Sequence, residues 1–319
     1  MKAAVVTAAH TPPLYADFAV PQAQPGLRSI AVSAAALSRV TRARASGTHY
    51  SSSSRYPFVA GVDGTGCLDD GRRVYFAFPP APFGAMAEHC VVEDAHCIAL
   101  PDGLDDVTAA ALAIPGMSSY AALIERARFV AGETVLVNGA TGSSGRLAVQ
   151  IAKHLGARKV IATGRNEAVL ESLRSEGADA TISLTQPEAD LERALASHFR
   201  EGIDVVLDYL WGPSARASLI AAAKALPDGY PLRFVQIGSI GGEDLPLPGA
   251  VLRSTAITLL GSGIGSVPMP RLMHALKSVF EIALPARLHI ETEAIPLSSV
   301  AECWERAESS KRIVLTVAR

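Results

Sequence analysis

Residues 134–153 read TVLVNGATGSSGRLAVQIAK, and this stretch decides the fold. A short β-branched run leads into a glycine-spaced turn, and the turn opens directly into an amphipathic helical pattern. The turn has the spacing Ala140-x-Gly142-x-x-Gly145, a dinucleotide-binding fingerprint with Ala in place of the first Gly. Gly142 lets the backbone approach a pyrophosphate, Gly145 lets the helix pack closely on the strand, and the helix N-terminus offers N–H groups to phosphates. This context predicts a nucleotide site formed by Ala140, Thr141, Gly142, Ser143, Ser144 and Gly145.

The composition is that of a folded, well-buried protein. The chain has 319 residues, enough for one large domain or for two domains that share an interface. Hydrophobic residues make up 49% and charged residues 19%, which excludes a disordered chain. The net charge of −2 predicts no nucleic-acid or anionic-membrane partner. No apolar run approaches the ~20 residues of a membrane span, and the N-terminal apolar run is too short for a signal peptide, so we expect a cytoplasmic protein.

Short apolar strands alternate with helices through the middle of the chain. This alternation predicts a doubly wound parallel sheet that is covered by helices on both faces. The strands are expected at residues 134–138, 159–163, 180–183, 204–208, 233–237 and 257–260, and the helices between them at 144–155, 166–176, 188–199 and 214–225.

The two ends of the chain have a different character. Residues 1 to about 110 carry short β-like runs broken by Pro and Gly, which predict an antiparallel, barrel-like domain. Helix-like segments follow at 107–113 and 118–126. The tail from about residue 270 is expected to return to the first domain and complete it. Its elements are predicted as a helix, a β-like stretch at 288–293, a helix at 297–309 and a strand at 313–318.

The second strand of the alternating region predicts which dinucleotide binds. A cofactor with a free ribose 2′-hydroxyl usually meets Asp or Glu about 20 residues past the glycines. Here the strand ends in Thr-Gly-Arg-Asn, and Arg165 supplies a cation that can pair with a 2′-phosphate. NADPH is therefore favoured over NADH, although a solvated Arg165 and the nearby Glu167 leave NADH as the alternative. The residues assigned to this part of the cofactor are Thr163, Gly164, Arg165 and Asn166.

Several collinear segments carry a family resemblance over most of the chain. They include YPFVAGVDGTG at 56–66, PGMSSYAAL at 115–123 and GETVLVNGATGSSG at 132–145. With these segments the chain resembles the medium-chain dehydrogenase/reductase superfamily, and within it the zinc-free quinone oxidoreductases related to zeta-crystallin. The resemblance implies a GroES-like antiparallel β-barrel domain (1–112 and 280–319) joined to a Rossmann domain (113–279). Further matching segments are LPDGL at 100–104, AAAL at 109–112, DVVLD at 204–208, IPLSSV at 295–300 and KRIV at 311–314.

The same resemblance bears on zinc. Zinc-dependent relatives carry a Cys at the position of Ser38 and a Gly-His-Glu sequence where this chain has Gly-Val-Asp at 61–63. Val62 therefore stands at the His position. A catalytic zinc needs about three protein ligands and an open position, and Val62 cannot be a ligand. We expect no metal site.

Without a Lewis acid, reduction of a quinone or of an activated C=C bond is the favoured chemistry. Such a reaction needs a hydride from the nicotinamide and hydrogen-bond donors for the resulting oxyanion. Zinc-free relatives commonly show Leu-Asn-Pro-x-Asp followed by Gly-x-Tyr, whereas this chain has LSRVT at 37–41 and GTHY at 47–50. The Asn and Asp of the relatives do not carry over. The remaining catalytic candidates are Tyr50 and His49, which could donate a proton or simply line a loop.

Residues after the later strands are assigned to the nicotinamide end of the cofactor. Tyr209 follows the fourth strand, where it could wall the nicotinamide pocket or pack against a helix cap. Gly238, Ser239 and Gly263 follow the fifth and sixth strands, where relatives contact the nicotinamide through backbone groups.

The leading hypothesis is an NADPH-dependent, zinc-independent reductase of quinones or α,β-unsaturated carbonyl compounds. It is expected to form a homodimer, an inference from the family and from the apolar strand 257–260, which would pair edge to edge across a two-fold axis. Two alternatives stay open: an enoyl-thioester reductase, and a non-catalytic NADPH-binding sensor or structural protein. The physiological acceptor does not follow from the sequence, because specificity lies in the loops 38–56 and 240–268.

Overall fold

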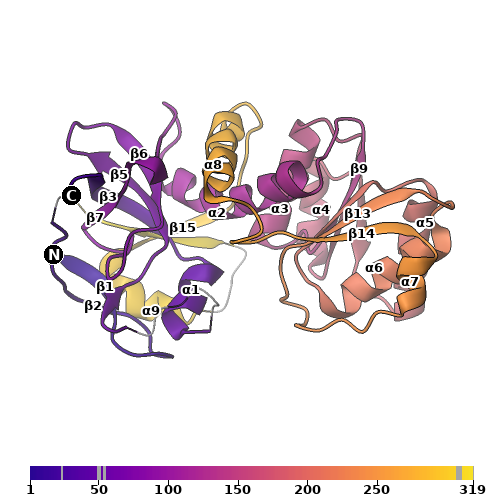
Figure 1. Cartoon of the computed structure of the whole chain (residues 1–319), viewed down its shortest axis with the longest axis horizontal. Helices are drawn as coiled ribbons and strands as arrows, with labels where there is room; N and C mark the ends of the chain where they lie inside the picture. Colours follow the sequence, from indigo (N-terminus) through magenta and orange to yellow (C-terminus); the bar gives the residue numbers. More distant parts are fainter. Residues whose placement is uncertain (23, 49–51, 53–54, 307–310, 319) are drawn as a thin grey trace. The chain divides into compact units, whose positions relative to one another are not determined.

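The computed structural model describes residues 1–22, 24–48, 52, 55–306 and 311–318. The chain divides into two compact units (Figure 1): Met1–Ile114 together with Phe280–Arg319, and Pro115–Val279. The first unit is built mainly from strands, and the second from strands that alternate with helices. This is the predicted combination of a GroES-like unit and a Rossmann unit, and the fold class is confirmed.

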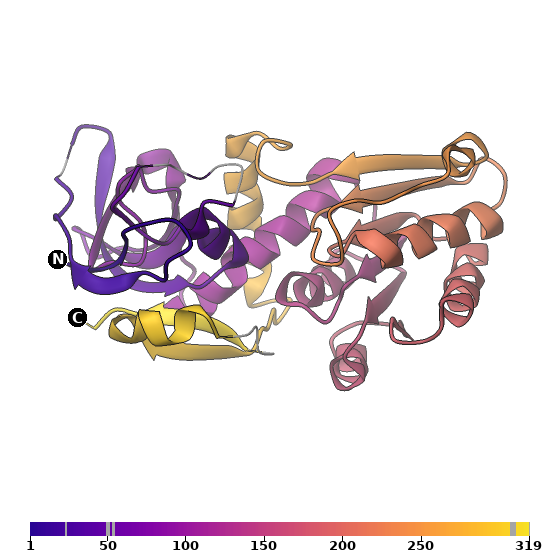
Figure 2. The same cartoon turned by 90° about the horizontal axis from the view of Figure 1, so that it is seen from below.

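The second unit contains a six-stranded sheet in which every neighbouring pair is parallel. The strand order places the first strand of the unit, β9, at the centre, which is the doubly wound arrangement. Helices lie on both faces of this sheet, as Figures 1 and 2 show. In sheet order the strands are β11 (Ala180–Ser183), β10 (Lys159–Gly164), β9 (Thr134–Asn138), β12 (Val205–Asp208), β13 (Pro231–Gln236) and β14 (Ala256–Gly261). The helices are α3 (Ser143–His154), α4 (Glu167–Ser175), α5 (Glu188–Arg200), α6 (Gly212–Ala225), α7 (Gly249–Arg253) and α8 (Met269–Ala283).

The first unit contains two sheets. A three-stranded sheet has the order β2-β1-β4, and a seven-stranded sheet has the order β15-β16-β3-β5-β6-β8, with β7 also pairing β3. The C-terminal β16 pairs antiparallel with β3, with Val314 opposite Ala36, so the tail does return to the N-terminal strands as predicted. The strands are β1 (Lys2–Val6), β2 (Leu14–Asp17), β3 (Leu27–Ala36), β4 (Phe58–Val59), β5 (Asp63–Leu68), β6 (Arg73–Ala77), β7 (His89–Glu93), β8 (Cys97–Ala99), β15 (Thr292–Pro296) and β16 (Arg312–Thr316).

Two details of the tail differ from the expectation. The β-like stretch predicted at 288–293 is found four residues later, as β15. Leu288 and Ile290 are both 6% exposed, so they alternate with an exposed His289 like a strand, but pairing with β16 begins only at Thr292. The helix predicted at 297–309 begins as a short 3₁₀ turn (Leu297–Ser299) followed by α9 (Val300–Trp304), and residues 307–309 of the prediction lie outside the described residues.

Helix α2 (Asp106–Ala121) continues into a π-helical turn at Ala122–Arg126. The two predicted helical segments are therefore one helix that contains Pro115. Proline normally disrupts a helix because it has no N–H, but Leu112 and Ala113, in the turn before Pro115, are 0% exposed, and their packing in the core stabilises the helix. Of the described residues, 106–126 form one helix long and apolar enough to cross a membrane, which corrects the expectation that no apolar run approaches this length. Its most apolar window is 67% buried inside the protein, as in a core helix.

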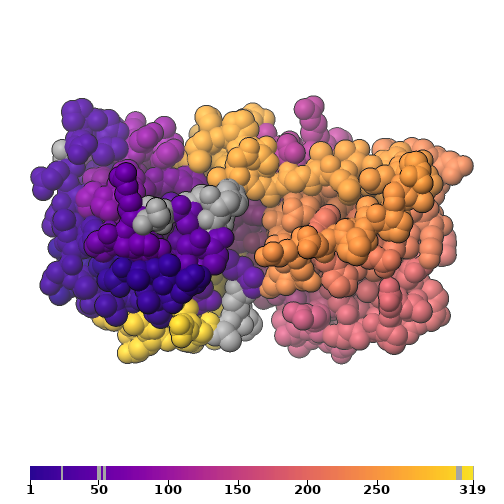
Figure 3. Space-filling view, turned by 60° about the horizontal axis from the view of Figure 1, so that its bottom comes forward, coloured from indigo at the N-terminus to yellow at the C-terminus, as the bar shows by residue number. Residues whose placement is uncertain are grey.

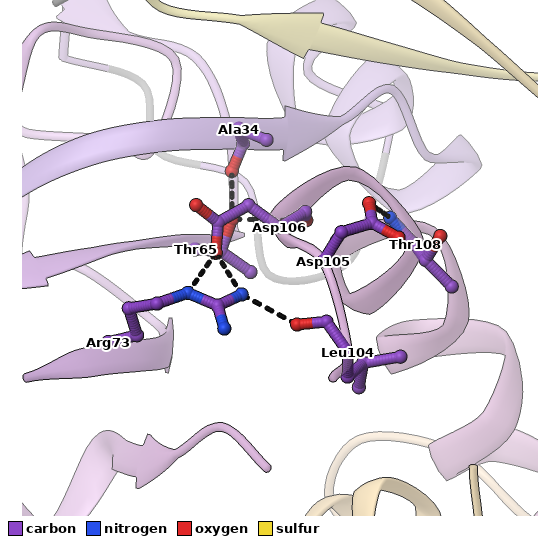
Figure 4. A network of polar contacts seen from close by, with 7 residues as sticks. All are labelled: Ala34, Thr65, Arg73, Leu104, Asp105, Asp106 and Thr108. Atoms are coloured by element: carbon purple, nitrogen blue, oxygen red, sulfur yellow. Dashed lines mark hydrogen bonds and ion pairs between the residues drawn. The ribbon is translucent and has the colours of Figure 1, made fainter. Parts of the chain in front are cut away.

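The start of α2 is anchored to the sheet of the first unit by a polar network (Figure 4). The Arg73 guanidinium on β6 donates to the Asp106 carboxylate at 2.8 Å and to the Leu104 carbonyl oxygen at 2.6 Å. The Thr65 hydroxyl on β5 lies 3.2 Å from the Asp106 carbonyl oxygen. Asp105 caps the helix, because its carboxylate accepts the backbone N–H of Thr108 at 2.9 Å. These bonds fix where the helix begins.

Candidate functional site

The glycine turn lies between the carboxyl end of β9 and the first turn of α3, which begins at Ser143. Gly142 is the N-cap residue of α3 and is exposed. A Cβ placed on Gly142 would find its nearest neighbour, the Gly139 carbonyl oxygen, 3.8 Å away. The helix N-terminus is therefore open to a ligand, and its first N–H groups belong to residues whose side chains are small. This geometry fits a pyrophosphate.

Two other glycines of the predicted site allow close packing. A Cβ on Gly145 would lie 2.3 Å from the Gly139 carbonyl oxygen and 2.7 Å from the Cα of Ala140, so only glycine fits there. A Cβ on Gly164 would lie 2.3 Å from the Thr141 Cγ2 atom. Thr141 thus packs directly over the end of β10, and the structure brings the two predicted parts of the cofactor site together.

A buried hydrogen-bond network connects the ends of the three central strands. The Thr163 hydroxyl on β10 donates to the Asn138 side-chain oxygen at 2.7 Å. The Asn138 side-chain NH₂ group donates to the Asp208 carboxylate on β12 at 2.8 Å. The same Thr163 hydroxyl accepts the Gly139 backbone N–H at 3.3 Å. Thr163, Asn138 and Asp208 are 0% exposed. Thr163 therefore supports the glycine turn from its buried side and does not face a ligand.

The Asp208 carboxylate also organises the loop that follows β12. It accepts the backbone N–H groups of Leu210 and Trp211, each at 3.1 Å. Trp211 has a φ of 59°, which residues with a side chain rarely adopt, and these hydrogen bonds hold it there. Burial raises the pKa of Asp208, while the hydrogen bonds from Asn138 and from the two backbone groups lower it. Asn138 and Asp208 were not predicted, although each is a polar residue that ends a buried apolar strand.

Tyr209 is held by a second cluster. The Ser119 hydroxyl on α2 lies 2.9 Å from the carbonyl oxygens of Pro115 and Ser144, and 2.8 Å from the Tyr209 hydroxyl. Since Ser119 has one proton to donate to these carbonyls, the Tyr209 hydroxyl donates to Ser119. Burial raises the pKa of Tyr209, so its hydroxyl stays neutral. This hydroxyl therefore joins the β12 loop to α2 and to the start of α3.

At the tip of β10 the two remaining predicted residues behave differently. Asn166 is the N-cap of α4, and its side-chain oxygen accepts the Val169 backbone N–H at 3.1 Å. Arg165 is exposed, and it makes no hydrogen bond or ion pair anywhere in the described part of the chain. A guanidinium without a carboxylate partner, directly after Gly164, which contacts the glycine turn, is suited to an anionic group.

The residues predicted near the nicotinamide lie on loops after β13 and β14. Gly238 accepts no side chain, because a Cβ there would lie 2.6 Å from the Tyr209 carbonyl oxygen. Ser239 and Gly263 are exposed. The loop that contains Gly263 is fixed by Arg126, which donates to the carbonyl oxygens of Gly261 at 2.6 Å and of Ser266 at 3.4 Å. Arg126, on the π-helical turn, is a contact that the sequence did not predict.

Substitution of Arg126 by glutamine is expected to loosen the loop 261–266. The variant loses two hydrogen bonds from a charged donor, so we expect the Gly263 amide to exchange its hydrogen about tenfold faster, which corresponds to about 1.4 kcal/mol. Hydrogen–deuterium exchange measures this directly. Arg271→Gln is the control, because Arg271 pairs with Glu125 and does not bond the loop. Equal exchange rates in the wild type and Arg126→Gln would contradict this role.

In the first unit, the positions of the family's Asn and Asp hold a pair of hydroxyls. Ser38 is the N-cap of α1 (Arg39–Ser46), and its hydroxyl oxygen accepts the Thr41 backbone N–H at 3.1 Å. The two side-chain hydroxyls lie 2.9 Å apart, and both residues are almost fully buried. Each hydroxyl group is therefore a hydrogen-bond partner of the other. The catalytic candidates Tyr50 and His49 lie outside the described residues.

A buried carboxyl group lies next to Val62 in the same unit. Asp63, on β5, is 1% exposed, and its Oδ2 atom accepts the Tyr75 hydroxyl at 3.2 Å. Its Oδ1 atom finds no hydrogen-bond partner among the residues that the structure describes. Burial raises the pKa of Asp63 from 3.8 to about 7, although the nearby Arg312 charge and the Tyr75 hydrogen bond oppose this shift.

Side chains of the types that bind metals do not gather in the described part of the chain. No three His, Cys, Asp or Glu side chains there come together in a group that could hold a metal ion. The four cysteines are free thiols, and burial raises the pKa of Cys90 to about 12 and of Cys97 to about 11.

Known proteins are similar to this chain over its whole length. The family described as Zinc-binding dehydrogenase matches residues 145–278. The probable NADPH-dependent quinone reductase tdiC of Emericella nidulans is 29% identical, with 99% of each chain covered. The quinone oxidoreductase of Lama guanicoe is 30% identical over 73% of this chain and 70% of that protein. The solved quinone oxidoreductase of Thermus thermophilus, also crystallised with NADPH, superposes with a TM-score of 0.81 at 24% identity, covering 99% of this chain and 100% of that one.

Proposed function

Because this chain belongs to the quinone oxidoreductase family of the medium-chain dehydrogenase/reductase superfamily, we propose that it is an NADPH-dependent enzyme that reduces quinones or α,β-unsaturated carbonyl compounds. The observation that carries the proposal is the open turn at Gly142 beside the unpartnered guanidinium of Arg165. The turn at Gly142 leaves room for the pyrophosphate, and the Arg165 guanidinium supplies a cation for the 2′-phosphate.

Different residues of the second unit are proposed to bind different parts of NADPH. The N–H groups at the start of α3, with Ser143 and Ser144, hold the pyrophosphate, and Arg165 pairs with the 2′-phosphate. Tyr209, Gly238, Ser239 and Gly263 border the nicotinamide. When bound, NADPH supplies the hydride that reduces the acceptor. The protein orients the two reactants, excludes water and donates hydrogen bonds to the oxyanion that forms.

The reaction is proposed to proceed without zinc. The matched Zinc-binding dehydrogenase segment, 145–278, does not include Ser38 or Val62, the positions where zinc-dependent relatives carry ligands. Ser38 is bonded to Thr41, and Val62 is 4% exposed with no donor atom in its side chain. The proton donor is then a side chain or water, and Tyr50 and His49 remain the proposed donors.

Oxidation of NADPH by a panel of quinones, enones and enoyl-CoA thioesters tests this function. We expect turnover with quinones or free enones that persists after dialysis against a zinc chelator. Activity confined to enoyl-CoA would replace the proposal by an enoyl-thioester reductase. Tight NADPH binding with no oxidation by any acceptor would replace it by a sensor or structural protein.

We further propose a homodimer formed through the edge strand β14. Among the described residues, β14 has a strand partner on one side only, β13, which leaves a row of backbone N–H and C=O groups unpaired. Leu259 on this strand is 39% exposed. Antiparallel pairing with the same strand of a second copy would satisfy these groups and bury apolar surface.

Leu259→Lys is expected to convert this dimer to a monomer, because it places a charge on the edge that pairs. Sedimentation velocity at micromolar protein concentration measures the change. Leu284→Lys, another exposed leucine that lies in the first unit, is the control and should stay dimeric. A wild-type protein that sediments as a monomer would refute the dimer.

A further inference from the structure

A groove in the first unit is used by none of the functions proposed above. It has a volume of about 690 Å³, within the usual range for small-molecule sites. Three separate segments form its walls: the turn after β1, one face of α1 and the end of α9. Figure 3 shows the N-terminal segment, in indigo, bordering the C-terminal segment, in yellow, on the surface.

The charges that line this groove are mainly positive. Arg39 and Arg42 lie one helical turn apart on α1, and both line the groove together with His10 from the turn after β1. Glu305 is the acidic residue among the lining side chains. Among the described residues that line the groove, two guanidinium groups and one carboxylate leave a net positive charge, so the groove favours an anion.

Arg42 gives the strongest indication of a missing partner. One Nη atom donates to the Arg306 carbonyl oxygen at 3.3 Å, a long hydrogen bond. The Nε atom is buried, and no acceptor for it exists in the described part of the protein. A buried N–H group without an acceptor costs free energy, and an oxygen anion in the groove would remove part of that cost.

The other residues that line the groove indicate that its ligand also has an apolar part. Pro12, Ala43 and Trp304 present apolar surface to the groove. The opposite face of α1 is separate from it, because Ser38 and Thr41 are buried there against one another. We propose that this groove binds a small ligand that carries an oxyanion, a phosphate or a carboxylate, on an apolar body. The oxyanion lies between Arg39 and Arg42, and the apolar body lies against Trp304.

Titration with model compounds tests the groove without reference to enzyme activity. The chain has two tryptophans, so in a Trp211→Phe background the emission of Trp304 reports on this site alone. The probes are phenyl phosphate, benzoate, inorganic phosphate and neutral benzyl alcohol. We expect saturable binding of phenyl phosphate or benzoate, weaker binding of inorganic phosphate and none of benzyl alcohol. The ratio of phenyl phosphate to benzoate affinity identifies which oxyanion the groove prefers.

Four variants distinguish an effect of side-chain charge on ligand affinity from an effect of misfolding. Arg42→Gln should weaken binding about tenfold or more, and Arg42→Lys should weaken it less, because lysine keeps the charge but not the planar fork. Glu305→Gln should tighten binding about threefold, since it removes the negative charge found among the described lining residues, and a gain cannot come from misfolding. Arg253→Gln, at an exposed position on α7, is the control and should bind as the wild type does.

Two results would overturn the proposal: no saturable change in Trp304 emission with any anion, or binding that Arg42→Gln and Glu305→Gln both leave unchanged. Arg165→Ala keeps this test apart from the proposed cofactor site. It should leave the affinity of the groove unaltered even if it abolishes the preference for NADPH.

Discussion

Asp63→Asn is expected to remove a large pH dependence of stability. The pKa of Asp63 is raised from 3.8 to about 7 in the folded protein, chiefly by burial. Between these values the folded state binds a proton that the unfolded state does not. The stabilisation is therefore fully present below about pH 4, and it is lost as the pH rises through about 7. Asparagine does not ionise, so the variant loses nothing over this range.

The measurement is the free energy of unfolding by urea at several pH values for both proteins. The difference, variant minus wild type, should rise between pH 4.5 and pH 8 by at most about 4 kcal/mol, at 1.36 kcal/mol per pKa unit. Any constant cost of the asparagine amide cancels in this comparison. Asp228→Asn, at an exposed site, is the control and should give a difference that does not vary with pH. A flat profile for Asp63→Asn would show that the carboxyl is ionised at low cost beside Arg312.

The second large effect is expected at Arg165. Replacement by alanine removes the cation proposed to pair with the 2′-phosphate, and we expect the Kd for NADPH to rise about 10- to 100-fold. The Kd for NADH should stay the same, because NADH has no group at this position. Stability should be unaffected, since Arg165 is exposed and has no partner among the described residues.

Fluorescence titration of both cofactors with the wild type and the variant checks this expectation. Arg253→Ala, which removes an equally exposed arginine from the same unit, is the matched control. An equal loss of affinity for both cofactors would mean that Arg165 contacts a part that they share. If Arg165→Ala lost affinity for neither cofactor, Arg165 would be a solvated side chain, and NADH would again be a candidate cofactor.

The Rossmann unit could be predicted from the sequence because its signals are local. The strand, the glycine turn and the helix of residues 134–153 are adjacent in the chain, and one periodicity identifies each of them. The network below the turn could not be predicted in the same way. Thr163, Asn138 and Asp208 are far apart in sequence, and only the register of β9, β10 and β12 brings them side by side.

The errors have physical causes too. The alternation of Leu288 and Ile290 imitates a strand, but a strand requires a partner, and β16 reaches only as far as Thr292. The segments predicted as helical at 107–113 and 118–126 belong to one helix that runs through Pro115, because burial in the core outweighs the loss of one hydrogen bond. In the sequence, Asp63 stands out only as the counterpart of the Glu in zinc-dependent relatives. Its burial depends on strands that pair at long range.

The network of Thr163, Asn138 and Asp208 has a consequence for how cofactor preference can change. It holds the glycine turn from inside the protein, whereas Arg165 lies exposed just beyond the end of β10. The residues that hold the glycine turn are thus separate from Arg165, the residue that we propose distinguishes NADPH from NADH. Drift at position 165 could exchange one reductant for the other while the scaffold stays intact, and the tip of β10 is the place where redesign of this protein should begin.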